Sequence, residues 1–205
     1  MIATALATTA RLISGASVEW RCSPHTDAQR IYFGNHSSHL DFVVIWSALP
    51  PRLRERARPV AGRDYWENGG VRRYLAGRVF RAVLIDRAPA GTASLESARA
   101  SIKRMAEEMG NHDSLIVFPE GTRSRDGEVA AFKSGLYHLS RLRQAELIPV
   151  YLENLNRILP KGETLPVPML SRVVFGAPLP ARPDETKQAF LDRARDAVVQ
   201  LRSPR

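Results

Sequence analysis

The chain reads Ile31-Tyr32-Phe33-Gly34-Asn35-His36-Ser37-Ser38-His39-Leu40-Asp41 over residues 31–41. Three apolar residues, a glycine and then a polar run are typical of a strand that ends in a loop. The run Leu40–Leu49 is apolar on most sides, which predicts a buried helix, and Pro50 and Pro51 end it. Strand, loop and helix in this order form the first half of a unit from which α/β folds are built.

Similar segments continue along the rest of the chain. Short apolar runs that predict strands occur at residues 17–21, 59–61, 82–86, 115–118, 147–152 and 172–176. Helices are predicted at residues 3–13, 95–109, near 136–143 and about 190–201. In the second of these, the residues that step by three and four are Leu95, Ala98, Ile102, Met105 and Met109. The alternation predicts one α/β domain spanning residues 1–205.

The charge of the chain is unusual for a protein of otherwise ordinary composition. The formal net charge is +9 and the pI about 10.4, and 26 of the 30 basic residues are arginine. Arginine suits phosphate contacts better than lysine, so nucleic acid, anionic lipid or a phosphorylated substrate would each account for the excess. Cys22 is the sole cysteine, which excludes an intrachain disulfide and favours a reducing compartment.

No segment of the sequence predicts a membrane span or a signal peptide. The longest charge-free apolar stretches, residues 1–10 and 42–51, are ten residues long, whereas a spanning helix needs about 20. The N-terminus also lacks a basic region followed by a strong apolar block.

The G-x-S-x-G, P-loop and H-E-x-x-H motifs are absent as well, which argues against serine hydrolases, nucleoside triphosphatases and zinc metalloproteases.

His36 and Asp41 are the candidate catalytic residues. A histidine that takes a proton from an alcohol needs its second ring nitrogen held by an acceptor, and Asp41 can supply one if the loop folds back. Ser37 or Ser38 could then cap the following helix. In the other interpretation, which spacing alone favours, Asp41 and the serines are plain capping residues and His36 is a partly buried hydrogen-bonding residue. His39 is expected to face away from the pair or to pack.

A second loop follows the predicted strand at residues 115–118 and reads Phe118-Pro119-Glu120-Gly121-Thr122-Arg123-Ser124. Glycine lets a backbone N–H approach a phosphate closely, threonine adds a hydroxyl donor, and arginine adds a charged fork. The same residues would also suit an ordinary β-turn with an ion pair between Glu120 and Arg123. Lys133 and Arg87 could extend an anion site, although Lys133 alone favours a solvated surface position and Arg87 could equally pair with a neighbouring carboxylate.

Ten arginines crowd residues 52–87 and are interleaved with Tyr65, Trp66, Tyr74 and Phe80. Basic residues with aromatic anchors suit an anionic membrane surface, and nucleic acid would use the same ingredients. Because no helix-turn-helix, zinc-finger or ribonucleoprotein signature accompanies the run, the membrane ranks first. A solvated, solubilising face is the remaining interpretation.

Taken together, the motifs resemble the glycerolipid acyltransferase family, whose best-known members are the 1-acylglycerol-3-phosphate acyltransferases. The resemblance rests on Asn35 and His36-x4-Asp41, followed at the expected distance by the loop at residues 118–124. Supporting blocks occur in the same order, namely Ile85-Asp86-Arg87, Phe132-Lys133-Ser134-Gly135 and Ile148-Pro149-Val150. The likeness covers about residues 30–180, most of the chain.

The resemblance implies a single α/β domain in which a mixed, mostly parallel sheet is flanked by helices, as in glycerol-3-phosphate acyltransferase-like folds. It implies transfer of a fatty acyl group from acyl-coenzyme A or acyl-carrier protein to the hydroxyl of a lysophospholipid, first of all 1-acylglycerol-3-phosphate, giving phosphatidate. His36 would act as general base and Asp41 would orient it, without an acyl-enzyme. The residues implied to hold the acceptor are Arg87, Glu120, Gly121, Thr122, Arg123 and Lys133. No metal and no cofactor beyond the acyl thioester co-substrate are expected.

The resemblance further implies peripheral association with the cytoplasmic face of the cell membrane, where residues 1–14 would form a short helix that contacts an anionic surface. Nucleic acid is not an expected partner under this interpretation. Two functions of other kinds stay open on the sequence alone. One is a non-catalytic basic module that binds membrane or nucleic acid, and the other is a thioester hydrolase in which His36 activates water.

Overall fold

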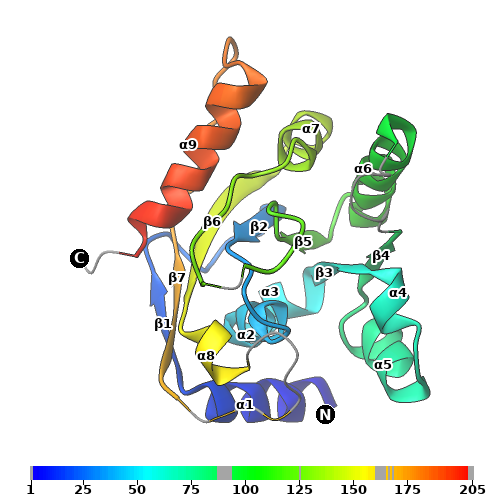
Figure 1. Cartoon of the computed structure of the whole chain (residues 1–205), viewed down its shortest axis with the longest axis vertical. Helices are drawn as coiled ribbons and strands as arrows, with labels where there is room; N and C mark the ends of the chain where they lie inside the picture. Colours follow the sequence, from blue (N-terminus) through cyan, green and yellow to red (C-terminus); the bar gives the residue numbers. More distant parts are fainter. Residues whose placement is uncertain are drawn as a thin grey trace.

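The computed structural model of the chain describes residues 2–86, 94–124, 126–159, 165, 167 and 169–202. Within these residues seven strands form one sheet in the order β1-β7-β6-β2-β5-β3-β4 (Figure 1). The strands are β1 (Ala16–Trp20), β2 (Arg30–Gly34), β3 (Ala57–Gly62), β4 (Val83–Ile85), β5 (Ser114–Val117), β6 (Glu146–Glu153) and β7 (Ser171–Phe175). Neighbouring strands are parallel except for β6 and β7, which are antiparallel. The predicted α/β fold with a mixed, mostly parallel sheet is therefore confirmed.

Helices cover both faces of this sheet. They are α1 (Ile2–Ser14), α2 (Asp41–Ala48), α3 (Pro51–Arg56), α4 (Arg63–Trp66), α5 (Gly70–Tyr74), the π-helix η1 (Leu75–Val79), α6 (Leu95–Met109), α7 (Gly135–Leu142), α8 (Leu155–Ile158) and α9 (Lys187–Gln200). Helices α6, α7 and α9 pack on one face, and α1, α2, α3 and α8 pack on the other (Figure 1). The result is three layers with one apolar core on each side of the sheet.

Strand β2 lies at the centre because its residues are apolar on both sides. Ile31 and Phe33 join the core beneath α6, α7 and α9, whereas Tyr32 joins the core beneath α1 and α2. All three side chains are fully buried, as expected for a parallel strand covered on both faces. The predicted helical face of α6 is right for Ile102, Met105 and Met109 but wrong for Leu95, which is 80% exposed, and for Ala98, which is exposed as well.

The register of the central strands brings the two motif loops together. Strand β2 pairs in parallel with β5, with Ile31 opposite Leu115, so both strands end at the same edge of the sheet. Strands β3 and β4 run in the same direction and end at this edge too. In open parallel sheets the crevice outside the carboxyl ends of the strands is the usual place for a ligand.

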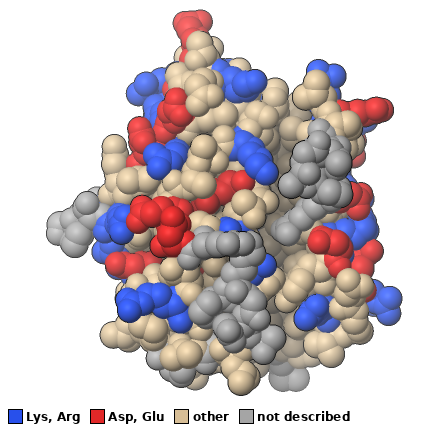
Figure 2. Space-filling view, viewed as in Figure 1, with Lys and Arg blue, Asp and Glu red and all other residues tan. Residues whose placement is uncertain are grey.

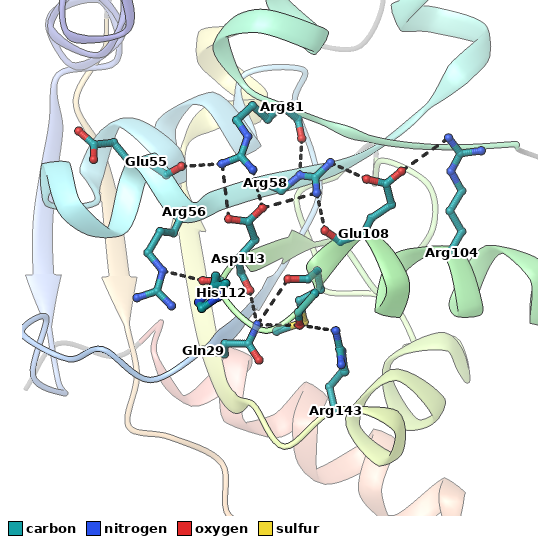
Figure 3. A network of polar contacts seen from close by, with 12 residues as sticks. Gln29, Glu55, Arg56, Arg58, Arg81, Arg104, Glu108, His112, Asp113 and Arg143 are labelled. Atoms are coloured by element: carbon teal, nitrogen blue, oxygen red, sulfur yellow. Dashed lines mark hydrogen bonds and ion pairs between the residues drawn. The ribbon is translucent and has the colours of Figure 1, made fainter.

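The arginine-rich run of residues 52–87 does not form one face. Arg58 and Arg81 lie where β3 and β4 begin, at the edge opposite the motif loops, and Arg81 pairs with Asp113 at 2.7 Å (Figure 3). Arg58 pairs with Glu108 at 2.8 Å and also reaches Asp113 at 3.5 Å. Arg63, by contrast, follows the end of β3. The run is therefore divided between two ends of the sheet.

The aromatic residues of this run differ in how far they are buried. Phe80 is 3% exposed, and both Phe80 and Trp66 contact Phe42 edge to face, with ring centroids 5.0 and 5.4 Å apart. The prediction of surface anchors is thus wrong for Phe80, whereas Tyr65 and Trp66 are half-buried and Tyr74 is 48% exposed. On the face shown in Figure 2, Lys and Arg are interspersed with Asp and Glu. None of the helices in the described parts of the chain is both long and apolar enough to span a membrane.

Candidate active site

A cavity of about 730 Å³ opens at the edge of the sheet where β2, β5, β3 and β4 end. The first motif loop contributes His36 and His39 to its wall, and the second contributes residues 118, 119 and 121–123. Helices α6 and α7 add an apolar side that includes Met105, Leu136 and Leu139. The cavity therefore combines titratable side chains with an apolar wall.

The predicted pair of His36 and Asp41 meets in the structure. The Nδ1 atom of His36 lies 2.8 Å from Oδ2 of Asp41, and Asp41 is fully buried at the start of α2. The same oxygen accepts hydrogen bonds from the backbone N–H groups of Ser37 at 2.6 Å and Ser38 at 2.9 Å. Because this oxygen is an acceptor for all three groups, the hydrogen of the imidazole belongs on Nδ1. The other nitrogen, Nε2, is then an acceptor, and His36 lines the cavity.

Neither serine occupies the N-cap position of α2, although the hydroxyl of Ser38 accepts a hydrogen bond from the N–H of Leu40 at 3.2 Å. The N-cap residue is Leu40, whose side chain cannot cap, and the carboxylate of Asp41 instead binds the backbone of the preceding turn. The hydroxyl of Ser38 donates to the carbonyl of Leu159 at 2.9 Å. The polar residues of the first motif therefore fold their own loop around Asp41, which fixes His36 next to it.

Residues of the second motif loop bind both the backbone N–H and the backbone carbonyl of His36. The N–H of His36 donates to Oε1 of Glu120 at 2.8 Å, and the carbonyl of His36 accepts from the N–H of Ser124 at 2.7 Å. The ring of His36 stacks on Phe118, with the centroids 4.3 Å apart and the planes 14° from parallel. Backbone and ring are thus both fixed by residues about 85 positions away in the sequence.

Glu120 lies behind the cavity wall rather than in it. Its side chain is 3% exposed, and its second oxygen accepts from the N–H of Ala130 at 3.3 Å. Burial raises the pKa of Glu120 to about 7, although the two N–H donors oppose the change. The structure therefore gives Glu120 a role in holding the His36 loop and does not bring it into the cavity with Gly121, Thr122 and Arg123.

Gly121, Thr122, Arg123 and Lys133 all line the cavity. Gly121 has φ +72°, a backbone conformation that favours glycine, and a Cβ atom there would displace the end of the Lys133 side chain, whose Nζ lies 2.7 Å from its position. The backbone N–H of Lys133 donates to the carbonyl of Pro119 at 2.9 Å, which ties the start of α7 to the loop. Arg87, the remaining predicted residue, lies outside the described residues.

No group of three or more His, Cys, Asp or Glu side chains gathers into a metal-binding arrangement anywhere in the described ranges. The chemical groups brought together at the cavity are an oriented imidazole and cationic side chains. This combination suits proton removal from a hydroxyl on a substrate that also carries an anionic group.

Comparison with known proteins identifies the family. The model of the acyltransferase family matches residues 21–153, which contain both motif loops. The chain belongs to the glycerolipid acyltransferase family.

Members of this family with known names are similar over much of the chain. A 1-acyl-sn-glycerol-3-phosphate acyltransferase from Limnanthes douglasii is 31% identical over 164 residues, covering 77% of this chain and 53% of the relative. The 1-acyl-sn-glycerol-3-phosphate acyltransferase alpha of Homo sapiens is 28% identical over 197 residues, covering 92% of this chain and 65% of the relative. The chain spans about half to two thirds of the length of these curated relatives.

A solved structure supports the same fold. The crystal structure of the 1-acyl-sn-glycerophosphate acyltransferase PlsC from Thermotoga maritima matches with a TM-score of 0.70 at 20% identity. The match covers 97% of this chain and 76% of that one. Nearly the whole described sheet and its helices therefore belong to the fold of that acyltransferase.

The site of this family member also contains residues that the sequence did not single out. His39 was expected to face away or to pack, and it does pack, because its ring stacks on Tyr65 with centroids 4.7 Å apart. Both rings nevertheless line the cavity that contains His36. The signal in the sequence was that His39 belongs to the same motif loop as His36. Tyr65 gave no such signal, since it reaches the site only through the fold.

Proposed function

We propose that the chain transfers a fatty acyl group from an acyl thioester to the free hydroxyl of 1-acylglycerol-3-phosphate, giving phosphatidate. The observation that carries the proposal is the 2.8 Å contact between His36 and Asp41 on the wall of a cavity that also contains Arg123 and Lys133. The imidazole suits the hydroxyl, and the cations suit the phosphate. The names of the similar proteins support this acceptor.

In the proposed reaction Nε2 of His36 takes the proton of the acceptor hydroxyl as its oxygen attacks the thioester carbonyl carbon. The new C–O bond forms, the C–S bond breaks, and the imidazolium returns the proton to the thiolate that leaves. Asp41 holds the Nδ1–H tautomer and stabilises the imidazolium. Proton transfer of this kind contributes about 10²–10⁴-fold to rate. The acceptor oxygen is itself the nucleophile, so the chain needs no acyl-enzyme.

The acceptor phosphate and the fatty chains would bind different parts of the cavity. The phosphate would bind Arg123 and Lys133, with the backbone of Gly121 and the hydroxyl of Thr122 as further donors, and with Arg87 as a proposed additional cation. The apolar wall of α6 and α7 suits a fatty chain. The donor would be acyl-coenzyme A or acyl-carrier protein. A metal ion has no part in this scheme.

We also propose peripheral contact with the cytoplasmic face of the membrane, since both substrates carry fatty chains. Helix α1 exposes Ile2 and Leu12, at 56% and 76%, and α5 exposes Val71 at 75%. Apolar side chains beside arginines suit an anionic lipid surface. Sedimentation with anionic liposomes, repeated with neutral liposomes, would test this part of the proposal.

The test of the proposed reaction is thiol release from palmitoyl-coenzyme A by the purified protein on anionic liposomes. The acceptors to compare are lysophosphatidate, glycerol-3-phosphate, lysophosphatidylethanolamine and none. We expect release that needs lysophosphatidate and that falls by at least about 10²-fold in His36→Ala. His112→Ala, which removes an exposed imidazole at the opposite edge of the sheet, is the matched control and should keep full activity.

The other possible outcomes of the thiol-release assay would each indicate a different function. Equal thiol release without any acceptor, still dependent on His36, would make the chain a thioester hydrolase. A lack of release from both palmitoyl-coenzyme A and palmitoyl-acyl-carrier protein would contradict acyl transfer and leave a binding module. Liposome and nucleic-acid binding measured against salt concentration would then distinguish those two partners.

A further inference from the structure

A stack of three side chains stands at the cavity beside His36. The guanidinium carbon of Arg72 lies 4.4 Å from the ring centroid of Tyr65, and the Tyr65 ring stacks on His39 at 4.7 Å with an interplanar angle of 18°. His39 comes from the first motif loop, whereas Tyr65 and Arg72 come from α4 and α5. Two segments that are distant in the sequence thus fix the orientation of one imidazole.

Burial, together with the positive charges nearby, favours the neutral form of His39. Burial lowers its pKa from 6.5 to about 4, and the positive charge of Arg123 is the largest further cause, followed by His36 and Arg72. The charged and titratable groups that surround it are Arg123, His36, Arg72 and Asp41, with Tyr65 against its ring and Asp64, Asp86 and Lys133 elsewhere in the cavity wall. An anion placed among these cations would offset their repulsion and favour a protonated His39.

The position of His39 also fits the path of the acceptor. In the proposed function the acceptor phosphate binds Arg123 while its hydroxyl reaches His36. His39 lines the same cavity as both of these residues, near enough for each of them to lower its pKa. A hydrogen-bond donor at this place would contact the phosphate end of an acceptor that is aligned for proton transfer.

We propose that His39 is a binding residue for the acceptor phosphate, which it contacts together with Arg123, and that Tyr65 and Arg72 are positioning residues that hold its ring. This inference rests on the proposed function. The acceptor phosphate would then be bound by residues of both motif loops. The ligand that fits such a site is a phosphomonoester or another anion of similar size. Arg72, which is exposed and absent from the cavity wall, acts on His39 by holding Tyr65 and by its charge.

The variant that tests the contact is His39→Phe, because phenylalanine keeps the stack on Tyr65 and removes both ring nitrogens. We expect the KM for lysophosphatidate to rise about tenfold, as for the loss of one hydrogen bond to a charged group. The kcat and the KM for the acyl thioester should stay within about twofold. Arg72→Met should raise the acceptor KM by a smaller factor, about threefold, while Arg73→Met on the same helix serves as the control and should have no effect.

Two kinetic outcomes would overturn the proposal. An unchanged acceptor KM and kcat in His39→Phe would mean that the imidazole only packs. A lower kcat with an unchanged acceptor KM would mean that His39 acts on the reacting thioester and does not hold the phosphate.

A measurement without turnover separates this inference from the proposed reaction. The pKa of His39 can be followed by NMR, with the signal assigned by its loss in His39→Phe, before and after addition of glycerol-3-phosphate. We expect the pKa to rise by at least about one unit when the phosphate binds. An unchanged pKa at saturating glycerol-3-phosphate would refute the contact. A raised pKa in a protein that shows no acyl transfer would support the anion site and reject only the reaction.

Discussion

Replacing Glu120 by glutamine should weaken the dependence of folding stability on pH. The carboxyl group is 3% exposed and accepts hydrogen bonds from the backbone of His36 at 2.8 Å and Ala130 at 3.3 Å. Burial raises its pKa from 4.5 to about 7. The folded protein therefore keeps the proton of Glu120 at pH values where the unfolded chain has already released it.

The sign and size of the effect follow from this difference in pKa. Between pH 4.5 and about 7 the folded state binds more protons at Glu120 than the unfolded state, so the free energy of unfolding falls as the pH rises. The difference of about 2.5 units corresponds to about 3.5 kcal/mol at about 1.4 kcal/mol per unit. The loss is nearly complete at about pH 8, one unit above the folded pKa. Glutamine stays neutral, so this loss should disappear in Glu120→Gln.

Glutamine also has a cost of its own. Its carbonyl oxygen can keep the hydrogen bond from His36, but its NH₂ group would then meet the N–H of Ala130, which leaves a buried donor unpaired at about 1–2 kcal/mol. We therefore expect Glu120→Gln to be less stable than the wild type at pH 5 and more stable at pH 8.

Urea unfolding at pH 5, 6, 7 and 8 measures this crossover directly. Glu107→Gln removes an exposed carboxylate from α6 and is the control, for which the pH dependence of the wild type should be retained. If the unfolding free energies of Glu120→Gln and of the wild type fall in parallel between pH 5 and 8, the pKa assigned to Glu120 is wrong.

Three further variants test other parts of the structure. Asp41→Asn should lower kcat by about 10²–10⁴-fold in the thiol-release assay, because the amide no longer holds the Nδ1–H tautomer of His36, and an active variant would reject this role. Gly34→Ala should lower the free energy of unfolding, measured in urea, by about 1–3 kcal/mol, because the new Cβ would lie 2.6 Å from the carbonyl oxygen of Val150 between β2 and β6. A variant as stable as the wild type would show that the two strands can move apart to make room. Asp113→Asn should destabilise the protein by about 1–2 kcal/mol, because it weakens the ion pairs with Arg58 and Arg81 shown in Figure 3. The kcat and KM should stay unchanged, and a change in either would mean that this end of the sheet affects the cavity at the other end.

The long elements of the fold could be predicted because each carries its own pattern. The structure confirms a strand at the apolar run of residues 31–33, as β2 (Arg30–Gly34), and confirms α6 at Leu95–Met109 with the predicted bounds. The segment from 51 to 79 was harder, because its helices are only four to six residues long and show no period. Their places depend on tertiary contacts such as Trp66 on Phe42, which join residues more than twenty positions apart.

The orientation of side chains in the site was less predictable than their identity. The spacing of His36 and Asp41 permitted their contact, but spacing alone favoured a capped helix. Glu120 was expected at the acceptor, and only the fold shows that its oxygens bind backbone N–H groups of His36 and Ala130. A carboxylate can serve an anion site or its supporting loop, and the choice depends on donors from elsewhere in the chain.

The two motif loops depend on each other physically, which explains why neither alone was a strong signal. Glu120 and Ser124 bind the two sides of the His36 backbone, and between them Gly121, Thr122 and Arg123 face the cavity. The loop that supports the base therefore also carries the cation proposed for the phosphate. A shift of this loop would move both groups together and would preserve the distance between them. A spacing of this kind is what an acceptor with its hydroxyl and phosphate on one glycerol requires.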